Sequence, residues 1–328
     1  MPRSDGGGCL MLAHALDGDT PGARLDEARA VNVLRDDTLG WAHLSADHPD
    51  TPGWIAENLG YLDEAVIEAL TASATRSRAM RIGNGILVIL RGVNTNEGRD
   101  PEDMVSVRVW ADANRIVTLS RQRVKALGDI SDMLAAGDGP TTAGEFLSLL
   151  AARLNARLEP LVAQLDIETD ALEPRVVGTP DHTLRQQIVA MRLQVIELRR
   201  HSAPQKGALE DMEQSDLPFF DEGDRLHIAE TRQSLTRQLE NLDEMRDSLA
   251  VLRDELSGQL SDRLNRHMYF LSIISAIFLP LGFLTGLLGI NVGGVPGAGS
   301  PDAFWLFCAM LAVIIALQIA ILRFMRWL

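Results

Sequence analysis

Two long uncharged runs near the C-terminus constrain the fold of this chain more than any other feature. The first, Met268 to Leu288, has 21 residues, and the second, Phe304 to Leu322, has 19. Helices of these lengths are about 31 Å and about 28 Å long, close to the hydrocarbon thickness of a bilayer. A helical hairpin buried in a soluble core is the alternative, but such runs are rare in soluble folds. We therefore expect two membrane-spanning helices.

Positive charge flanks these runs on one side only. The segment 289–303 between them contains no Lys or Arg and a single acid, Asp302. Cytoplasmic flanks of membrane spans carry an excess of Lys and Arg, so both termini are expected in the cytoplasm and segment 289–303 outside. Two arginines precede the first run and two follow the second, namely Arg263, Arg266, Arg323 and Arg326.

The remainder of the chain is polar and acidic. The sequence is 46% hydrophobic yet has a formal net charge of -14, so its charges are segregated from the two apolar runs. This acidity disfavours a nucleic-acid partner, because phosphate binding requires clustered Lys and Arg. It favours the attraction of cations, over about 8 Å in physiological salt.

The N-terminal part and the cysteines predict neither secretion nor a metal site. The apolar stretch from Cys9 to Leu16 is short and contains His14, so we do not interpret it as a signal peptide. Cys9 and Cys308 form no Cys-x-x-Cys motif and are not expected to pair, which agrees with a reduced, cytosolic location of the polar part.

The polar part begins with a mixture of strand and helix patterns. Short apolar or alternating runs predict strands, and apolar residues at helical spacing predict a helix. Together they predict a small sheet with helices packed on it. The predicted strands cover 31–35, 40–45, 85–94, 104–112 and 115–120, the last two as a hairpin, and the predicted helix covers 52–72.

Beyond Thr141 the pattern is helical. One helical segment follows Thr141, and a second is expected to end before Pro204 because proline breaks helices. No proline then occurs from about Asp221 to Pro280, and leucines at 242, 249 and 256 repeat every seven residues, as in a coiled coil. We expect one continuous helix from about residue 222 to 288, about 100 Å long.

The predicted fold class is an α+β cytoplasmic domain with a helical stalk and two C-terminal transmembrane helices. The expected segments are an α/β domain (1–140), cytoplasmic helices (141–220), the stalk helix (221–288) continuing into the first span (268–288), an extracytoplasmic loop (289–303), the second span (304–322) and a cytoplasmic tail (323–328).

One face of the first span is made largely of small or mildly polar residues. Small residues allow helices to pack closely in membranes, which is one interpretation. The other is the wall of a pore, which needs a ring of subunits because two helices cannot enclose a water path. We call this set the small-residue face: Asn265, Met268, Ser272, Ser275, Leu279, Gly282 and Gly286.

The chemistry of this face predicts a cation that keeps its water. The face has no His, Cys, Asp or Glu, the side chains that hold dehydrated zinc or magnesium. The span ends on Gly289, Ile290 and Asn291, followed by a Gly- and Pro-rich loop. A Cβ at Gly289 would crowd the turn. The Asn291 amide oxygen can accept from ion-bound water without holding the ion too tightly, so we expect metal contact there through water.

The sequence FLPLGFLTGLLGINVGGVPG resembles the signature of the CorA-type metal ion transporters. Gly-Ile-Asn stands where that family has Gly-Met-Asn, and this substitution with the following GGVPG resembles the ZntB zinc-transporter branch. The stretches TRSRAMRIGNGILVILRGVN (75–94) and RIVTLSRQRVKALGDI (115–130) and the ending RWL agree with the family. The resemblance covers nearly the whole chain.

The resemblance implies a funnel-shaped homopentamer in a bacterial-type cytoplasmic (inner) membrane, with the first spans lining the pore. It implies transport of divalent cations, with zinc as the leading substrate. Gly289, Ile290 and Asn291 map onto the family motif at the outer mouth, and Met268 and Leu279 onto hydrophobic constrictions. Magnesium-specific members often carry more acid in the outer loop, where this chain has only Asp302, and often end in a basic cluster, where it has only two arginines.

Three functions remain open at this point. The first is a zinc transporter, either a channel or a proton-coupled carrier; the second is a CorA-type magnesium or cobalt channel. The third is a membrane-anchored sensor or scaffold. No enzyme is expected, because the seven histidines form no spacing that demands a metal or catalytic base. No cofactor is expected either; the expected partners are further copies of the chain, membrane lipid and the transported cation.

Overall fold

The computed structural model describes residues 8–18, 20–36, 38–72, 76–178, 181–290 and 299–325. The chain divides into two compact units, Met1–Arg253 and Asp254–Leu328. The boundary between the units falls within one long helix, α9 (Glu222–Leu288).

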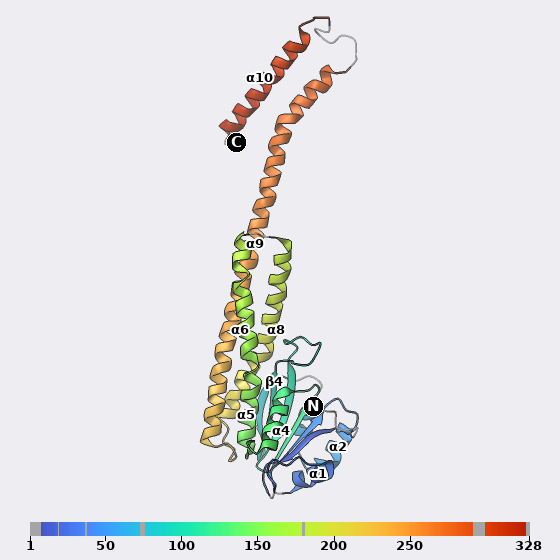
Figure 1. Ribbon diagram of the computed structural model, residues 1–328, viewed down its shortest axis with the longest axis vertical. Coiled ribbons are helices and arrows are strands. Elements are labelled where there is room, and N and C mark those ends of the chain that lie inside the picture. Colours follow the sequence, from blue (N-terminus) through green and yellow to red (C-terminus); the bar gives the residue numbers. More distant parts are fainter. Residues whose placement is uncertain are drawn as a thin grey trace. The chain divides into compact units, whose positions relative to one another are not determined.

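The first unit is built around a six-stranded sheet with the order β1-β2-β6-β5-β4-β3. Figure 1 shows the strands of this unit as arrows, with β4 labelled. Strands β2 and β6 are parallel, and all other neighbouring strands are antiparallel. Between β2 and β6 the chain forms two helices and the three strands β3, β4 and β5, and β6 then returns beside β2. The strands are β1 (Leu10–Ala15), β2 (Gly40–Ser45), β3 (Arg78–Ile82), β4 (Gly85–Gly92), β5 (Val105–Ala111) and β6 (Arg115–Ser120).

Three helices pack on one face of the sheet. Leu34, Ile55 and Leu70, one from each helix, lie in the same buried cluster as Leu87 of β4 and Val117 of β6. Because successive side chains of a strand point to opposite faces, this cluster uses only alternate positions of the strands. The helices are α1 (Glu27–Arg35), α2 (Thr51–Asn58) and α3 (Glu64–Thr71).

Helices α4 (Lys125–Ala136) and α5 (Ala143–Asn155) contact the other face. The ring of Trp41 on β2 lies 5.0 Å from that of Phe146 on α5, centroid to centroid. Nε2 of His14 on β1 lies 2.8 Å from Oγ of Ser131 on α4. The sheet is therefore covered on both faces, which explains why β4 is apolar along almost its whole length.

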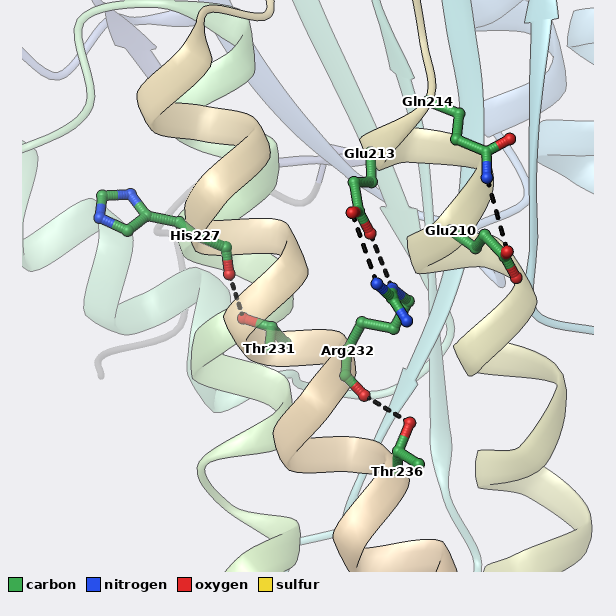
Figure 2. Close-up of polar contacts among 7 residues, drawn as sticks. All are labelled: Glu210, Glu213, Gln214, His227, Thr231, Arg232 and Thr236. Carbon is green, nitrogen blue, oxygen red and sulfur yellow. Dashed lines mark hydrogen bonds and ion pairs between the residues drawn. The ribbon is translucent and has the colours of Figure 1, made fainter.

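Long helices follow the sheet. Helices α8 (His182–Glu213) and α9 are joined by ion pairs: Glu213 Oε2 accepts from Arg232 Nε at 2.7 Å, and Asp243 Oδ1 lies 2.6 Å from Arg199 Nε. Figure 2 shows the Glu213–Arg232 pair, in which both carboxylate oxygens face the guanidinium group. The remaining helices are α6 (Leu158–Asp170), α7 (Glu173–Gly178) and α10 (Ala303–Phe324).

The helix predicted over about 222–288 is present as the single helix α9, 67 residues long. Leu242, Met245 and Leu249 of its heptad stripe are buried. The burial explains why this part of the helix has an apolar stripe within an otherwise charged sequence.

The prediction of a strand over 31–35 is wrong, because these residues end helix α1. Asp26 caps that helix by accepting from the backbone N–H of Arg29 at 2.9 Å. Ala30 and Leu34, four residues apart, are both buried and face the sheet. The β-branched valines of this run favour a strand, but the cap and the helical spacing of the buried residues outweigh that preference.

The prediction that a helix ends before Pro204 is also wrong, since α8 continues through this proline to Glu213. Proline removes the N–H that would bond the carbonyl of residue 200. Leu198 before it and Leu209 and Met212 after it are buried, so tertiary packing holds the helix together across the break.

Other elements differ in extent or were not predicted. The helix expected over 52–72 is two helices, α2 and α3, because Asp63 starts a new helix by accepting from Ala65 N at 2.9 Å. Strands β1 and β3 and helix α4 were not predicted as such. The strands β2, β4, β5 and β6 lie where they were expected, and β5 and β6 form the predicted antiparallel hairpin.

Candidate functional site

The second unit contains the C-terminal part of α9 and the whole of α10, and these helices are the two candidate membrane spans. Their most apolar windows have mean hydropathy values of 2.2 and 2.6, and only 6% of each window is buried within the chain. Helices of this length and composition that expose their apolar side chains are suited to a lipid or oligomer environment.

A proline and a glutamine connect the two helices. Pro280 has no N–H, so the carbonyl of Ala276, four residues earlier in α9, lacks its usual helical donor. The side-chain Nε2 of Gln318 on α10 donates to this carbonyl at 3.4 Å. In an apolar surrounding, backbone groups freed by proline are tolerated where a neighbouring helix supplies a partner.

The small-residue face lies opposite the side of α9 that becomes buried in the chain. Ile273 is buried, and Ile277 and Leu284 are half-buried, at a spacing of three to four residues. At 3.6 residues per turn the small-residue face is on the other side of the helix. Its members are all exposed: Asn265, Met268, Ser272, Ser275, Leu279, Gly282 and Gly286.

The glycines of this face do not pack against α10. A Cβ built on Gly282 or Gly286 would have no atom of the described residues within 4 Å. The close-packing interpretation of these small residues therefore does not apply within one chain.

The serine hydroxyls of this face are held in one orientation. Ser272 Oγ donates to the carbonyl of Met268 at 2.9 Å, and Ser275 Oγ donates to that of Leu271 at 2.9 Å. Because the single hydroxyl proton is used within the helix, each oxygen offers only lone pairs to what lies beside it. Acceptors of this kind match the outward-pointing hydrogens of water bound to a cation.

Not all predicted site residues can be described. Gly289 and Ile290 follow the end of α9, and a Cβ at Gly289 would lie 2.8 Å from the carbonyl oxygen of Thr285, which agrees with the expected need for glycine. Asn291, predicted to contact metal through water, lies outside the described residues. Asp302 is exposed at the start of α10, where a carboxylate is favourable for the helix dipole.

No group of three or more His, Cys, Asp or Glu side chains that could hold a metal ion is present among the residues that the structure describes. Neither Gln318 nor Pro280 is among the residues that the sequence predicted for the site. Both could have been recognised in the sequence, because each interrupts an apolar run. A proline frees a backbone carbonyl and a glutamine adds a polar amide, and in an apolar helix such groups are destabilising unless they are hydrogen-bonded.

Comparison with known proteins identifies the family. Residues 36–323 match the model of the family described as "CorA-like Mg2+ transporter protein". The chain is 37% identical to the divalent cation transporter CmaX of Pseudomonas aeruginosa, over 97% of each chain, and 34% identical to the zinc transport protein ZntB of Yersinia enterocolitica, over 88% of each chain.

The fold agrees with this assignment. The solved structure of full-length CmaX is similar to this chain with a TM-score of 0.82 and 38% sequence identity, covering 97% of this chain and 98% of that one. The matched region includes both the sheet unit and the two apolar helices. The chain belongs to the family of CorA-like Mg2+ transporter proteins.

Proposed function

We propose that this protein transports divalent metal cations across a bacterial cytoplasmic membrane, with zinc as the first substrate. The names of the CmaX and ZntB relatives support cation transport, and the zinc transport relatives at 32–34% identity support zinc. The observation that carries the proposal is the exposed small-residue face of α9, on the side of the helix away from the face that is buried in the chain.

The path requires several copies of the chain. One α9 helix cannot enclose water, whereas a ring of copies related by cyclic symmetry can. A homopentamer is the assembly that the family resemblance implies, with five copies of the small-residue face toward the axis and α10 toward lipid. Met268 and Leu279 form its hydrophobic constrictions. Under the positive-inside rule, the flanking residues Arg263, Arg266, Arg323 and Arg326 support a cytoplasmic location of both chain ends.

The ion passes with much of its water. The back-bonded hydroxyls of Ser272 and Ser275 present acceptors to the hydration shell. At the outer end Gly289 and Ile290 lead to Asn291, whose amide oxygens form a ring that contacts ion-bound water. Asp302 is the acid in the outer loop that can attract cations. A hydrated path is compatible with the lack of a side-chain cage for metal in the part of the chain that the structure describes.

Flux into liposomes tests this proposal. Purified protein is reconstituted, and zinc entry is followed with a zinc-sensitive dye, with and without a pH gradient. We expect zinc flux that falls in Asn291→Ala but not in Ser300→Ala, a change in the same loop outside the motif. Absence of flux from reconstituted pentamers, or unchanged flux in Asn291→Ala, would contradict the proposal. A dependence on the direction of the pH gradient distinguishes a coupled carrier from a channel.

A magnesium or cobalt channel is the second candidate, favoured by the description of the matching family. Competition between zinc and magnesium for the same flux distinguishes a zinc transporter from a magnesium or cobalt channel. If magnesium is carried and zinc does not compete for the same flux, the zinc assignment is wrong. A sensor or scaffold that uses the hairpin as an anchor predicts no flux and requires no exposed small-residue face. The proposed function is transport and not enzymatic catalysis.

A further inference from the structure

A cavity of about 380 Å³ lies in the first unit between the segment before β3, the end of β4 and the middle of α8. Its size is in the range of sites that hold small molecules. Every residue that lines it belongs to the unit Met1–Arg253, so this cavity is separate from the candidate membrane helices. The lining residues are Arg76, Ser77, Arg91, Arg200, His201 and Pro204.

Positive charge predominates in this cavity. Three of its lining side chains are arginines, from three separate parts of the chain. Glu197 is the facing acid: its Oε1 lies 2.7 Å from His201 Nε2, and its Oε2 lies 3.5 Å from Arg200 Nη1. Glu197 contributes one carboxylate against the three guanidinium groups, so positive charge exceeds negative charge among these four side chains.

A fourth arginine, Arg108, lies close enough to Arg91 for the two charges to interact. Arg91 on β4 pairs with Ser106 on β5, two residues from Arg108, so Arg91 and Arg108 point to the same face of the sheet. Arg108 is 1% exposed; its Nη2 donates to the carbonyl of Ala72 at 2.8 Å, while Nε and Nη1 have no partner among the described residues. A buried cation that is only partly satisfied is costly, and a nearby anion would reduce that cost.

The cavity is also lined by a hydroxyl group that forms no hydrogen bond with any described residue. Ser77 is 5% exposed, and its Oγ has no hydrogen-bond partner in the described part of the chain. Buried hydroxyls are normally paired, so an unpaired one that lines a cavity indicates a ligand or water site. Ser77 and Arg76 are neighbours in the sequence, and both line the cavity.

We propose that this cavity binds the phosphoryl group of a small soluble molecule. Guanidinium groups donate pairs of parallel N–H bonds that match the oxygens of a phosphate, and a serine hydroxyl can donate one more. A single chloride ion would use neither this geometry nor the volume of the cavity. The site is distinct from the cation path, since it recognises an anion and lies in the other unit.

Titration calorimetry of the full-length protein in detergent tests the site, with pyrophosphate as the probe. The buffer contains a chelator, because pyrophosphate also binds divalent cations. We expect saturable binding that Arg76→Gln and Arg200→Gln each weaken by about tenfold or more, the loss of one charge-assisted hydrogen bond. Both side chains are exposed, so these variants should fold. The matched control is Arg185→Gln, an exposed arginine on the same helix, which should bind as the unmodified chain does.

Two further probes define the ligand class. Glycerol 3-phosphate should bind at the same site and be weakened by the same variants, and by Ser77→Ala several-fold. Vesicles that contain phosphatidic acid supply the same phosphoryl group on a lipid. Binding of the vesicles without binding of either soluble probe would overturn the proposal. So would pyrophosphate affinity that is unchanged in Arg76→Gln and Arg200→Gln, or displacement of pyrophosphate by an equal concentration of chloride.

Discussion

The side chain of Gln318 on α10 donates a hydrogen bond to the backbone carbonyl of Ala276 on α9. This is the carbonyl that Pro280 leaves without a donor in its own helix. A polar side chain in one apolar helix thus offsets a backbone defect in the other. The pair joins the two helices of the hairpin at this level.

A double-mutant cycle should detect this coupling. Pro280→Ala restores an N–H for Ala276, so Gln318→Leu should cost less stability in that background than in the unmodified chain. We expect a coupling energy of about 0.6–1.7 kcal/mol, as for interhelical hydrogen bonds in membranes. Unfolding in mixed detergent and SDS micelles measures it. Equal costs of Gln318→Leu in both backgrounds would show that the bond contributes nothing.

Truncation of a predicted constriction should increase ion flux. Leu279 is exposed on the small-residue face, and a hydrophobic ring there would exclude water when narrow. Leu279→Ala should therefore raise zinc or magnesium entry into liposomes several-fold. Leu288→Ala removes the same atoms from the opposite side of α9 and serves as the control. If both variants conduct as the unmodified protein does, Leu279 does not face the path.

The sheet should lose stability in acid because of His43. Burial lowers the pKa of this histidine to about 4, and the backbone hydrogen bond to Thr118 opposes the shift only in part. In the unfolded chain its pKa is about 6.5. Between these values the unfolded state binds a proton that the folded state does not. Stability is therefore full above about pH 6.5 and falls toward pH 4, by about 3 kcal/mol.

Thermal unfolding monitored by circular dichroism between pH 7.5 and 4.5 measures this loss. His43→Gln keeps a polar group near Thr118 but does not titrate in this range. Its unfolding temperature should therefore fall less steeply with acid than that of the unmodified chain. If the unfolding temperatures of the two proteins fall equally with pH, groups other than His43 cause the loss of stability in acid. His14 is also buried and its pKa is lowered by burial, so part of the slope should remain in the variant.

The ion pair between Glu213 and Arg232 should stabilise the contact of α8 with α9 (Figure 2). The hydrogen bond to Glu213 raises the pKa of Arg232, which favours the charged guanidinium group in this pair. The side chains are each 27% exposed, and we expect a coupling energy of about 0.5–1 kcal/mol that decreases with added salt.

The cycle of Glu213→Gln, Arg232→Gln and the double variant measures this coupling by denaturant unfolding. Exchange of the two residues, Glu213→Arg with Arg232→Glu, should recover part of the stability that either reversal alone removes. If the losses of stability in the two single variants add up to the loss in the double variant at low salt, the ion pair makes no net contribution to stability.

The amino-acid sequence by itself determined the features that depend on local pattern. The length and lack of charge of two runs predicted the apolar helices, and a proline-free heptad stripe predicted α9. Strands β2, β4, β5 and β6 were readable because their apolar residues are continuous or alternate. These patterns show which side of a single helix or strand is buried, and residues close together in the sequence are enough to reveal that.

Tertiary structure decided what depends on contacts between distant residues. Residues 31–35 form a helix because Ala30 and Leu34 pack on the sheet, and α8 continues through Pro204 because flanking leucines are buried. Arg76 precedes β3, Arg91 lies on β4 and Arg200 lies on α8, and only the packing of α8 beside β3 and β4 brings them to one cavity. The bond of Gln318 to Ala276 spans 42 residues. No local pattern contains such pairings, because their free energy arises only when the folded chain brings the partners together.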